Sequence, residues 1–279
     1  MGRARIIDCR RRLAGALLSA TVGAASTTMV VAASTTVVVA ATPSHAAPCA
    51  FAELGDGHVS DIVDARSVRL SDGREIRLAG IEVPPPEQRA AAMDALGALL
   101  RDRDIVLRGD DDAPDRYGRQ RAFAFIAGAD QPAQNELLRQ GAALRGIDVQ
   151  DRDCSLSLGT AEAEARTAQR GLWKIATVIK NAESPDDILA RVGLFTVVEG
   201  KVLSVRQTGT TTYLNFARSW TRGFAVTIPK RMVAVLEGAG IETKSLANRR
   251  VQVRGWVEAH QGPRLELSQI TQIEILSGN

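Results

Sequence analysis

The chain has 279 residues, a formal net charge of +3 and a sequence pI near 9.0. A chain of this length ordinarily forms two domains. Beyond the N-terminal leader described next, its cysteines and histidines are Cys49, Cys154, His58 and His260. This set excludes a zinc constellation, and it excludes a catalytic set built on histidine, whether Cys-His or Ser-His.

The first 46 residues have the pattern of a secretory signal peptide. Five arginines occur within residues 3–12, residues 13–42 carry no charge, and small residues occupy the −3 and −1 positions at Ser44 and Ala46. We expect cleavage near Ala46 and export to the periplasm or the medium. An uncleaved leader would instead be a membrane anchor. Its richness in Ala, Thr, Ser and Val makes stable insertion weak and favours cleavage.

Removal of this leader changes the charge balance. Residues 1–46 hold five arginines and one aspartate, which leaves the remainder near −1. Residues 50–173 hold 16 basic and 22 acidic side chains, whereas residues 195–279 hold 11 and 6. Affinity for nucleic acid follows the number of phosphates neutralised. The acidic first part is therefore unsuited to strong non-specific binding, and the basic second part leaves room for it.

The most informative stretch is residues 60–87, together with the sequence DRYGR at 115–119. Alternating apolar residues predict two strands joined at Ser71-Asp72-Gly73, where Asp and Gly favour a hairpin turn. The second strand carries Arg77 and ends at Glu82, before three prolines. Arginine forks bind phosphate oxygens and carboxylates hold hard divalent cations. These groups are suited to handling a phosphodiester.

The order strand, turn, R-L-x-x-I-[DE]-x-P, helix, D-[RK]-Y-G-R, helix, G-L-W resembles the thermonuclease (staphylococcal nuclease-like) family, over about residues 57–174. The resemblance implies a five-stranded OB-type barrel with flanking helices and calcium-dependent hydrolysis of DNA and RNA. In that family two carboxylates and a backbone carbonyl hold the ion. A glutamate serves as general base, and two arginines stabilise the transition state.

Several positions of this chain match the family's functional residues. Arg77 and Arg119 correspond to the two arginines, and Glu82 corresponds to one of the two metal aspartates. Val83 stands where the family has its carbonyl donor, a role that its backbone can still serve. The resemblance therefore names Arg77, Arg119 and Glu82 as catalytic candidates, with Glu82 as the candidate calcium ligand.

Two other positions depart from the family pattern. Arg66 stands in place of the second metal aspartate, and Pro85 stands in place of the general base. A guanidinium cannot ligate calcium, and a proline cannot take a proton from water. Asp64 and Glu87 are the candidate substitute acids. Glu87 also has a plainer interpretation as the start of a helix.

The rest of the first domain is predicted to support the barrel. Helices are expected at 86–103, 133–145 and 160–170. The cysteines Cys49 and Cys154 form one possible disulfide in an oxidising compartment, with two free thiols as the alternative. The acidic run 110–112 offers a substitute cation site or, more simply, a solvated loop.

A second all-β pattern follows a polar break, which we assign to a linker at 175–194. Strands are predicted at 197–205, 211–216, 224–228, 251–258 and 265–275, with a helix at 230–238. This order is typical of an OB-fold. The predicted fold class is thus mainly β with packed helices (α+β): a thermonuclease-type OB barrel at 50–174 and an OB-like β-barrel domain at 195–279.

Aromatic and basic residues are interleaved in the second domain. OB-folds hold single strands by stacking bases on aromatic rings among cations that bind phosphate. The residues predicted to bind single-stranded DNA or RNA in this way are Arg206, Tyr213, Arg218, Trp220 and Arg222. The alternative is that the aromatic residues fill the small barrel or that the domain binds proteins.

Three functions remain open from the sequence. The chain is a metal-dependent nuclease or phosphodiesterase with a rearranged site, an inactive protein that binds nucleic acid or another anion, or an envelope interaction protein. Calcium is expected only through the family resemblance. No nucleotide cofactor is expected, because Gly80, Gly118 and Gly171 are isolated and form no phosphate-cradling loop.

Overall fold

The structure is a computed structural model that describes residues 49–219 and 221–276. The chain divides into Met1–Ser44 and His45–Asn279, and every contact described below lies within the second unit. The predicted signal peptide and Trp220 lie outside the described residues. Within the described ranges, no helix combines the length and the apolar character needed to cross a bilayer.

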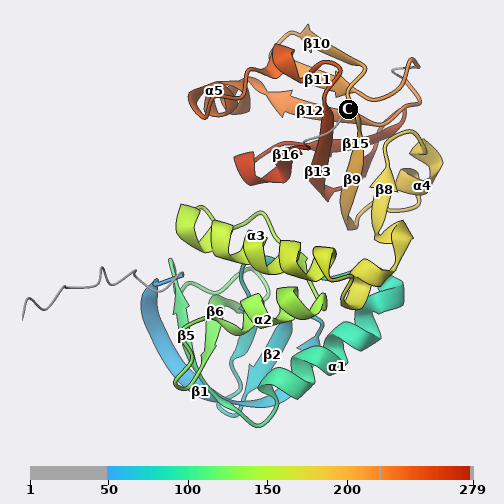
Figure 1. The fold of residues 1–279 in the computed structure, drawn as a ribbon. Coiled ribbons are helices and arrows are strands. Elements are labelled where there is room, and N and C mark those ends of the chain that lie inside the picture. The colour runs from blue at the N-terminus through green and yellow to red at the C-terminus, as the bar shows by residue number, and fades with distance from the viewer. Residues whose placement is uncertain (1–48, 220, 277–279) are drawn as a thin grey trace, which may run out of the picture. The chain divides into compact units, whose positions relative to one another are not determined.

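The first part of the unit is a closed five-stranded barrel (Figure 1). Around the barrel, the strands are β1 (Ala52–Asp64), β2 (Ser67–Leu70), β3 (Glu75–Leu78), β6 (Gln120–Ile126) and β5 (Asp104–Gly109). All neighbours are antiparallel except β3 and β6, which run parallel with Ile76 opposite Gln120. This confirms the barrel that the family resemblance implies, and it confirms the hairpin between β2 and β3.

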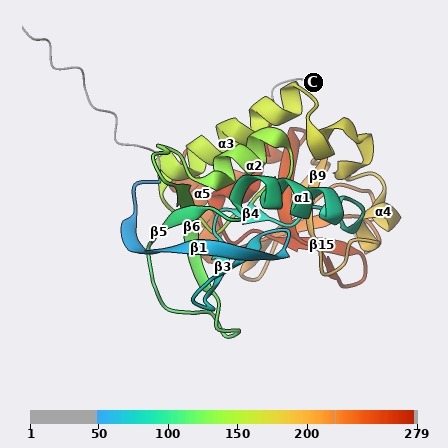
Figure 2. The same cartoon turned by 90° about the horizontal axis from the view of Figure 1, so that it is seen from below.

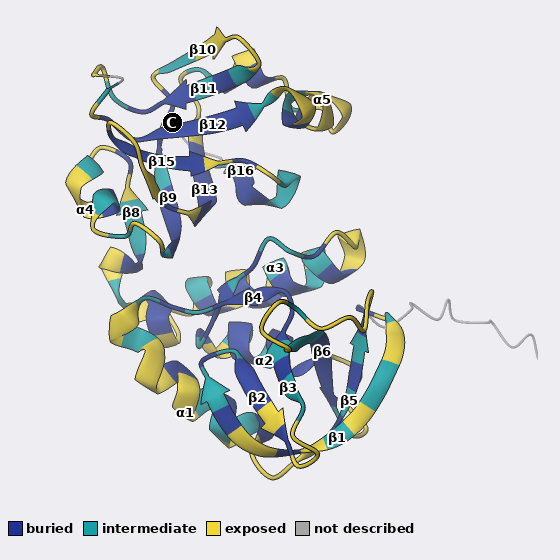
Figure 3. Ribbon diagram, turned by 180° about the vertical axis from the view of Figure 1, so that it is seen from behind, coloured by how far each residue is buried: buried dark blue, intermediate teal, exposed yellow. Residues whose placement is uncertain are grey.

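Two short strands form a separate two-stranded sheet that contains the candidate residue Glu82. They are β4 (Ile81–Glu82) and β7 (Leu144–Arg145), which pair antiparallel with Glu82 opposite Leu144. The barrel is filled by alternate apolar side chains, among them Ile76, Leu78 and Leu107. Figure 3 shows buried stretches along β2 and β3. Burying each such side chain stabilises the fold by about 1.5–3 kcal/mol.

Three helices pack on this barrel. They are α1 (Arg89–Leu100), α2 (Ala133–Gln140) and α3 (Arg152–Thr167). Figures 1 and 2 show α1 against β1, and α2 against β6 and α3. The bounds of two helices differ from those predicted. The helix α2 ends at Gln140, because Gly141 is its C-cap and has a left-handed φ of 69°. The helix α3 begins earlier than predicted, because Asp151 accepts a hydrogen bond from Cys154 N as an N-cap.

The second part of the unit contains two sheets. The first has the order β10-β11-β12-β15-β14 and the second the order β16-β13-β9-β8. Their elements are β8 (Ile179–Asn181), α4 (Pro185–Leu189), β9 (Phe195–Lys201), β10 (Ser204–Thr208), β11 (Thr211–Asn215), β12 (Ala225–Pro229), α5 (Lys230–Gly238), β13 (Arg250–Trp256), β14 (Glu258–Ala259), β15 (Pro263–Glu266) and β16 (Ile273–Ile275). The helix at 230–238 is confirmed, whereas the OB-like barrel predicted here stays a prediction.

The segment predicted as a linker has more structure than expected. It contains β8 and α4, and β8 pairs parallel with β9. Three predicted strands are also divided, at 197–205, 251–258 and 265–275. A parallel partner such as β8 is not visible in local periodicity, because the pairing joins segments through a crossover rather than a hairpin.

A buried ion pair links α3 to β13. Arg254 Nη2 lies 2.7 Å from Glu162 Oε2, and both side chains are only 3% exposed. Arg254 also donates to Gln252 Oε1 at 2.9 Å and to the carbonyl oxygen of Arg145 at 3.1 Å. Burial raises the pKa of Glu162, but the Arg254 guanidinium outweighs it and the pKa falls below its ordinary value. The carboxylate therefore stays charged and paired.

Cys49 and Cys154 are joined. The structure pairs Cys49 with Cys154 in a disulfide across a sequence separation of 105. This agrees with the predicted pairing and ties the chain before β1 to the first turn of α3. A crosslink closing a loop this long limits the unfolded ensemble strongly.

Removing the disulfide should destabilise the fold without changing the barrel. The double substitution Cys49→Ser, Cys154→Ser is expected to lower the free energy of unfolding by about 4 kcal/mol, from the loss of loop-closure constraint. Urea denaturation of both proteins measures it. A midpoint that is equal for the double variant and the oxidised parent would contradict the structural pairing.

Candidate functional site

An ion pair occupies the centre of the candidate site. The Arg66 guanidinium contacts Glu82 Oε2 through Nη1, with the two side chains 11% and 6% exposed. Arg66 Nη1 also donates to the carbonyl oxygen of Ile81 at 3.2 Å. The turn that presents Arg66 is held by Asp64, whose Oδ1 accepts from Arg66 N at 2.8 Å. The hydrogen bond from Arg66 N to Asp64 thus fixes the turn, and the turn places the Arg66 guanidinium beside the end of β4.

Arg77 lies beside this pair on β3. Its Nη2 is 4.0 Å from Glu82 Oε1, and its side chain is 28% exposed. Burial lowers the pKa of Arg77, and repulsion from the Arg66 guanidinium lowers it further. Two guanidiniums therefore share one carboxylate, which leaves the cluster of Arg66, Arg77 and Glu82 with a formal charge of one positive unit.

Glu82 is the least exposed member of the cluster. Burial raises the pKa of Glu82, and the nearby Arg66 only partly opposes this effect. The Glu82 carboxylate is therefore shielded from water and depends on the two arginines for favourable electrostatic contacts. Removing one partner of such a pair is strongly destabilising, because the remaining charge is left buried.

Arg119 is engaged by its own turn. Asp115 Oδ2 accepts from Arg119 Nε at 3.0 Å and from Arg119 Nη2 at 2.8 Å. These bonds from Arg119 hold the pKa of Asp115 at about 2. The Arg119 guanidinium also lies 5.1 Å from the ring centroid of Tyr117. The positive charge of Arg119 contributes to the lowered pKa of Arg77. The two arginines therefore repel one another electrostatically, although they do not share a carboxylate.

The candidate substitute acids have other partners. Glu87 is 62% exposed and its Oε2 lies 3.3 Å from Arg191 Nη1. Asp64 is bound to the turn at Arg66 N. Asp64 and Pro85 nevertheless line the same pocket as Glu82, so one candidate substitute acid and the position of the family's general base do lie beside the matched carboxylate.

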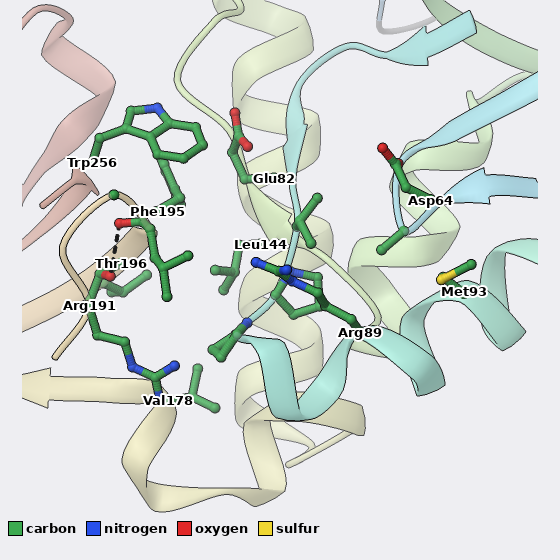
Figure 4. Close-up of a pocket in the computed structure, with 17 residues that line it drawn as sticks. Asp64, Glu82, Arg89, Met93, Leu144, Val178, Arg191, Phe195, Thr196 and Trp256 are labelled. Atoms are coloured by element: carbon green, nitrogen blue, oxygen red, sulfur yellow. Dashed lines mark hydrogen bonds between the residues drawn. The ribbon is translucent and has the colours of Figure 1, made fainter. Parts of the chain in front are cut away.

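That pocket has a volume near 280 Å³ and is mostly apolar. Figure 4 shows Glu82, Arg89 and Met93 together with Phe195 and Trp256, which come from β9 and β13. Phe195 and Trp256 pack edge to face with ring centroids 5.9 Å apart. Neither Arg77 nor Arg119 lines this space. The two family-matched arginines therefore lie outside the pocket that Glu82 lines.

Comparison with known proteins bears on this geometry. The family model described as Staphylococcal nuclease homologue matches residues 75–175. These residues belong to the staphylococcal nuclease homologue family. A search of curated proteins gave no match. The matched segment contains Arg77, Glu82 and Arg119. Arg66 precedes this segment in the sequence and lies on the turn between the barrel strands β1 and β2.

The staphylococcal nuclease domain of this chain does not fit a calcium ion at Glu82. Calcium takes about six to eight oxygen ligands, and the Arg66 guanidinium already occupies one Glu82 oxygen. Across residues 49–219 and 221–276, no group of three or more His, Cys, Asp or Glu side chains is arranged to hold a metal. The run at 110–112 is no exception, and Asp110 lies 3.9 Å from Arg121 Nη2.

Outside the staphylococcal nuclease domain, the structure brings together part of the predicted nucleic-acid set. Arg206 on β10 is directly opposite Tyr213 on β11. Arg264 of β15 lies over the same ring, 5.6 Å from its centroid, and all three line a pocket near 280 Å³. Arg218 and Arg222 lie apart from them, exposed in the loop between β11 and β12.

Arg264 was missed from the sequence. It reaches Tyr213 because β15 pairs parallel with β12, which places Arg264 opposite Ala225. The available signal was its position in the alternation of β15, where Leu265 is buried and Arg264 is on the other face.

The pH dependence of stability tests the environment of Glu82. A pKa raised above the ordinary value of 4.5 means that the folded state holds the proton more tightly than the unfolded state. The stabilising contribution is complete below 4.5 and is lost as the pH rises through the folded value. The free energy of unfolding of the parent minus that of Glu82→Gln should therefore fall with rising pH. A difference that grows with pH would mean that Arg66 dominates and lowers the pKa.

Proposed function

We propose that this chain is an exported protein of staphylococcal nuclease fold that binds phosphate-bearing polymers, with single-stranded nucleic acid as the best fit, and does not hydrolyse them through calcium. The observation that carries the proposal is the buried contact between Arg66 and Glu82. A guanidinium at that position supplies the positive charge that the metal supplies in the family. It cannot activate water or polarise a leaving group as a metal does.

The binding half of the proposal is supported by two arginine-containing surfaces. Arg77 keeps a partly exposed guanidinium and belongs to a cluster with one surplus positive charge. On the sheet of order β10-β11-β12-β15-β14, Arg206 and Arg264 flank Tyr213. Arginines bind phosphate, and an aromatic ring offers a face on which a base can stack.

The remaining parts of the proposal concern location and the general base. Export is supported by the charge pattern of residues 1–46 and by the disulfide, since disulfides persist in oxidising compartments. Absence of hydrolysis is supported further by Pro85, which offers no proton acceptor where the family has its base. The ion pair between Glu87 and Arg191 makes Glu87 a poor replacement.

One experiment measures binding and cleavage on the same substrate. The chain from Ala47 is mixed with a fluorescent single-stranded oligonucleotide, in calcium, magnesium, manganese or chelator. We expect the fluorescence anisotropy of the oligonucleotide to rise, because Arg206 and Arg264 bind its phosphates. We expect the oligonucleotide to stay intact in every metal. Arg264→Ala should weaken binding and reduce the salt dependence by about one phosphate contact.

The matched control is Arg231→Ala, an exposed arginine on α5 that does not line the pocket at Tyr213. It should change binding much less than Arg264→Ala. Metal-dependent cleavage that disappears in Arg77→Ala, Arg119→Ala would overturn the proposal and establish a nuclease with a rebuilt site. Neither binding nor cleavage would leave an interaction protein of the envelope as the function.

A further inference from the structure

The pocket at Tyr213 lies on the outward face of the sheet β10-β11-β12-β15-β14 (Figure 1). The alternate residues of its strands, such as Leu214 and Val226, belong to the hydrophobic core on the other face. The pocket has a volume near 280 Å³ and is therefore separate from that core. Its lining consists of Arg206, Thr208, Tyr213, Asn215, Ala225 and Arg264.

A small residue shapes this pocket. Ala225 on β12 lies between Asn215 on β11 and Arg264 on β15, in one row across the sheet. Because the side chain of Ala225 is a single methyl group, it leaves room for Arg264 to reach across β12. The Arg264 guanidinium thereby lies 5.6 Å from the centroid of the Tyr213 ring. Arg206 is directly opposite Tyr213 on the other neighbouring strand, so two cations lie beside one aromatic side chain.

Asn215 supplies a neutral polar group at the bottom of the pocket. Asn215 and Ala225 are the buried residues of the lining, only 5% and 6% exposed. The Asn215 side chain makes one hydrogen bond within the described residues, a long one of 3.3 Å from Nδ2 to Ser204 Oγ. An amide has two N–H donors and an acceptor oxygen. A donor and the oxygen therefore remain for a ligand.

The Asn215 oxygen is also accessible from the pocket. It accepts no hydrogen bond from the part of the chain that the structure describes. It is nevertheless not one of the fully enclosed side-chain atoms that lack a partner there. The oxygen therefore keeps accessible surface, and Asn215 presents that surface to the pocket that it lines.

The lining matches the parts of one nucleotide unit. Arginines bind phosphate oxygens, an aromatic ring offers a face for stacking, and an asparagine amide pairs with the polar edge of a base. A phosphate alone would leave the ring and the amide unused. A purely apolar ring would leave the amide unpaired in a buried place, which costs free energy. An unpaired base with its phosphate uses all three groups.

Two acids on the same face limit where the phosphates can run. Glu258 on β14 is opposite Arg264, and Glu266 on β15 is in the same row as Thr227 and Tyr213. Their carboxylates would repel phosphate. We therefore expect the nucleic-acid backbone to follow the β10 and β11 side of the face, with the base directed toward Asn215.

We propose that this pocket takes one unpaired adenine base and that Asn215 selects it, an assignment that rests on the nucleic-acid binding proposed above. Adenine presents the N6 donor and the N7 acceptor side by side, and an asparagine amide pairs with both. On the corresponding edge guanine presents two acceptors, cytosine a donor, and thymine an acceptor beside a methyl group. Adenine alone satisfies both halves of the amide there.

The test measures the affinity of the full chain for short fluorescent oligothymidylates by anisotropy. Their central base is thymine, adenine, cytosine or guanine. We expect the adenine oligonucleotide to bind about tenfold more tightly than the all-thymine one, from one bidentate pair. Two analogues at the same position examine each hydrogen bond. Purine lacks the 6-amino group and 7-deazaadenine lacks N7, so each should lose most of the gain.

Variants assign the preference to Asn215. Asn215→Leu removes the amide at similar volume, and should reduce the affinity for adenine to that for thymine while leaving the affinity for thymine nearly unchanged. The matched control is Thr211→Val, on the same strand and the same face but outside the pocket lining. It should keep the preference. If Asn215→Leu does not fold, the two base analogues with the parent chain still decide the assignment.

Several results would overturn the assignment. Equal affinity for all four oligonucleotides, tightest binding of another base, or a gain that survives in both analogues would contradict it and leave nucleic-acid binding itself intact. Equal weakening of all four by Asn215→Leu, together with a lower melting temperature, would make Asn215 a purely structural partner of Ser204. Absence of binding to every oligonucleotide would overturn both this assignment and the proposed function.

Discussion

The ion pair between Arg66 and Glu82 is the constraint on which the barrel site depends. A carboxylate at the end of β4 is almost completely buried, so it needs a compensating positive charge. In this chain the charge is covalently attached, on the turn between β1 and β2. A side chain cannot leave as an ion can, and it brings no open coordination position. The position beside Glu82, where the family resemblance implies a metal ion, is therefore taken by the Arg66 guanidinium. Arg77 remains partly exposed to solvent.

Charge compensation also organises the region where α3 meets the second part of the unit. Glu162 and Arg254 neutralise one another within a set of hydrogen bonds that includes Gln252. Arg145, which accepts from Arg254 only through its backbone carbonyl, remains without a carboxylate of its own. The two buried sites thus differ in one respect. At Glu82 two guanidiniums share one carboxylate and Arg77 is partly exposed, whereas Glu162 pairs with Arg254 alone.

The sequence predicted the features that depend on local order along the chain. Two strands and their hairpin at Ser71-Asp72-Gly73 follow from local patterning, whereas the barrel and the departures at Arg66 and Pro85 were implied by the family resemblance. Features that depend on distant pairing could not be predicted. The contact of Arg264 with Tyr213 requires a parallel pairing of β15 with β12, and β8 joins the second sheet by a crossover. The hydrogen bonds from Arg119 to Asp115 were not predicted for another reason. The family resemblance assigns that arginine to the substrate and not to a neighbouring aspartate.

Calcium titration by calorimetry tests whether the Arg66 guanidinium takes the place of a metal ion at Glu82. The parent chain and Arg66→Asp, which restores a carboxylate opposite Glu82, would be titrated under identical conditions, with Glu82→Gln as the control. We expect no saturable calcium binding by the parent, because the Arg66 guanidinium holds the Glu82 oxygen, and measurable binding by Arg66→Asp. Stoichiometric calcium binding by the parent that disappears in Glu82→Gln would contradict it, since the ion would then displace Arg66 from the site.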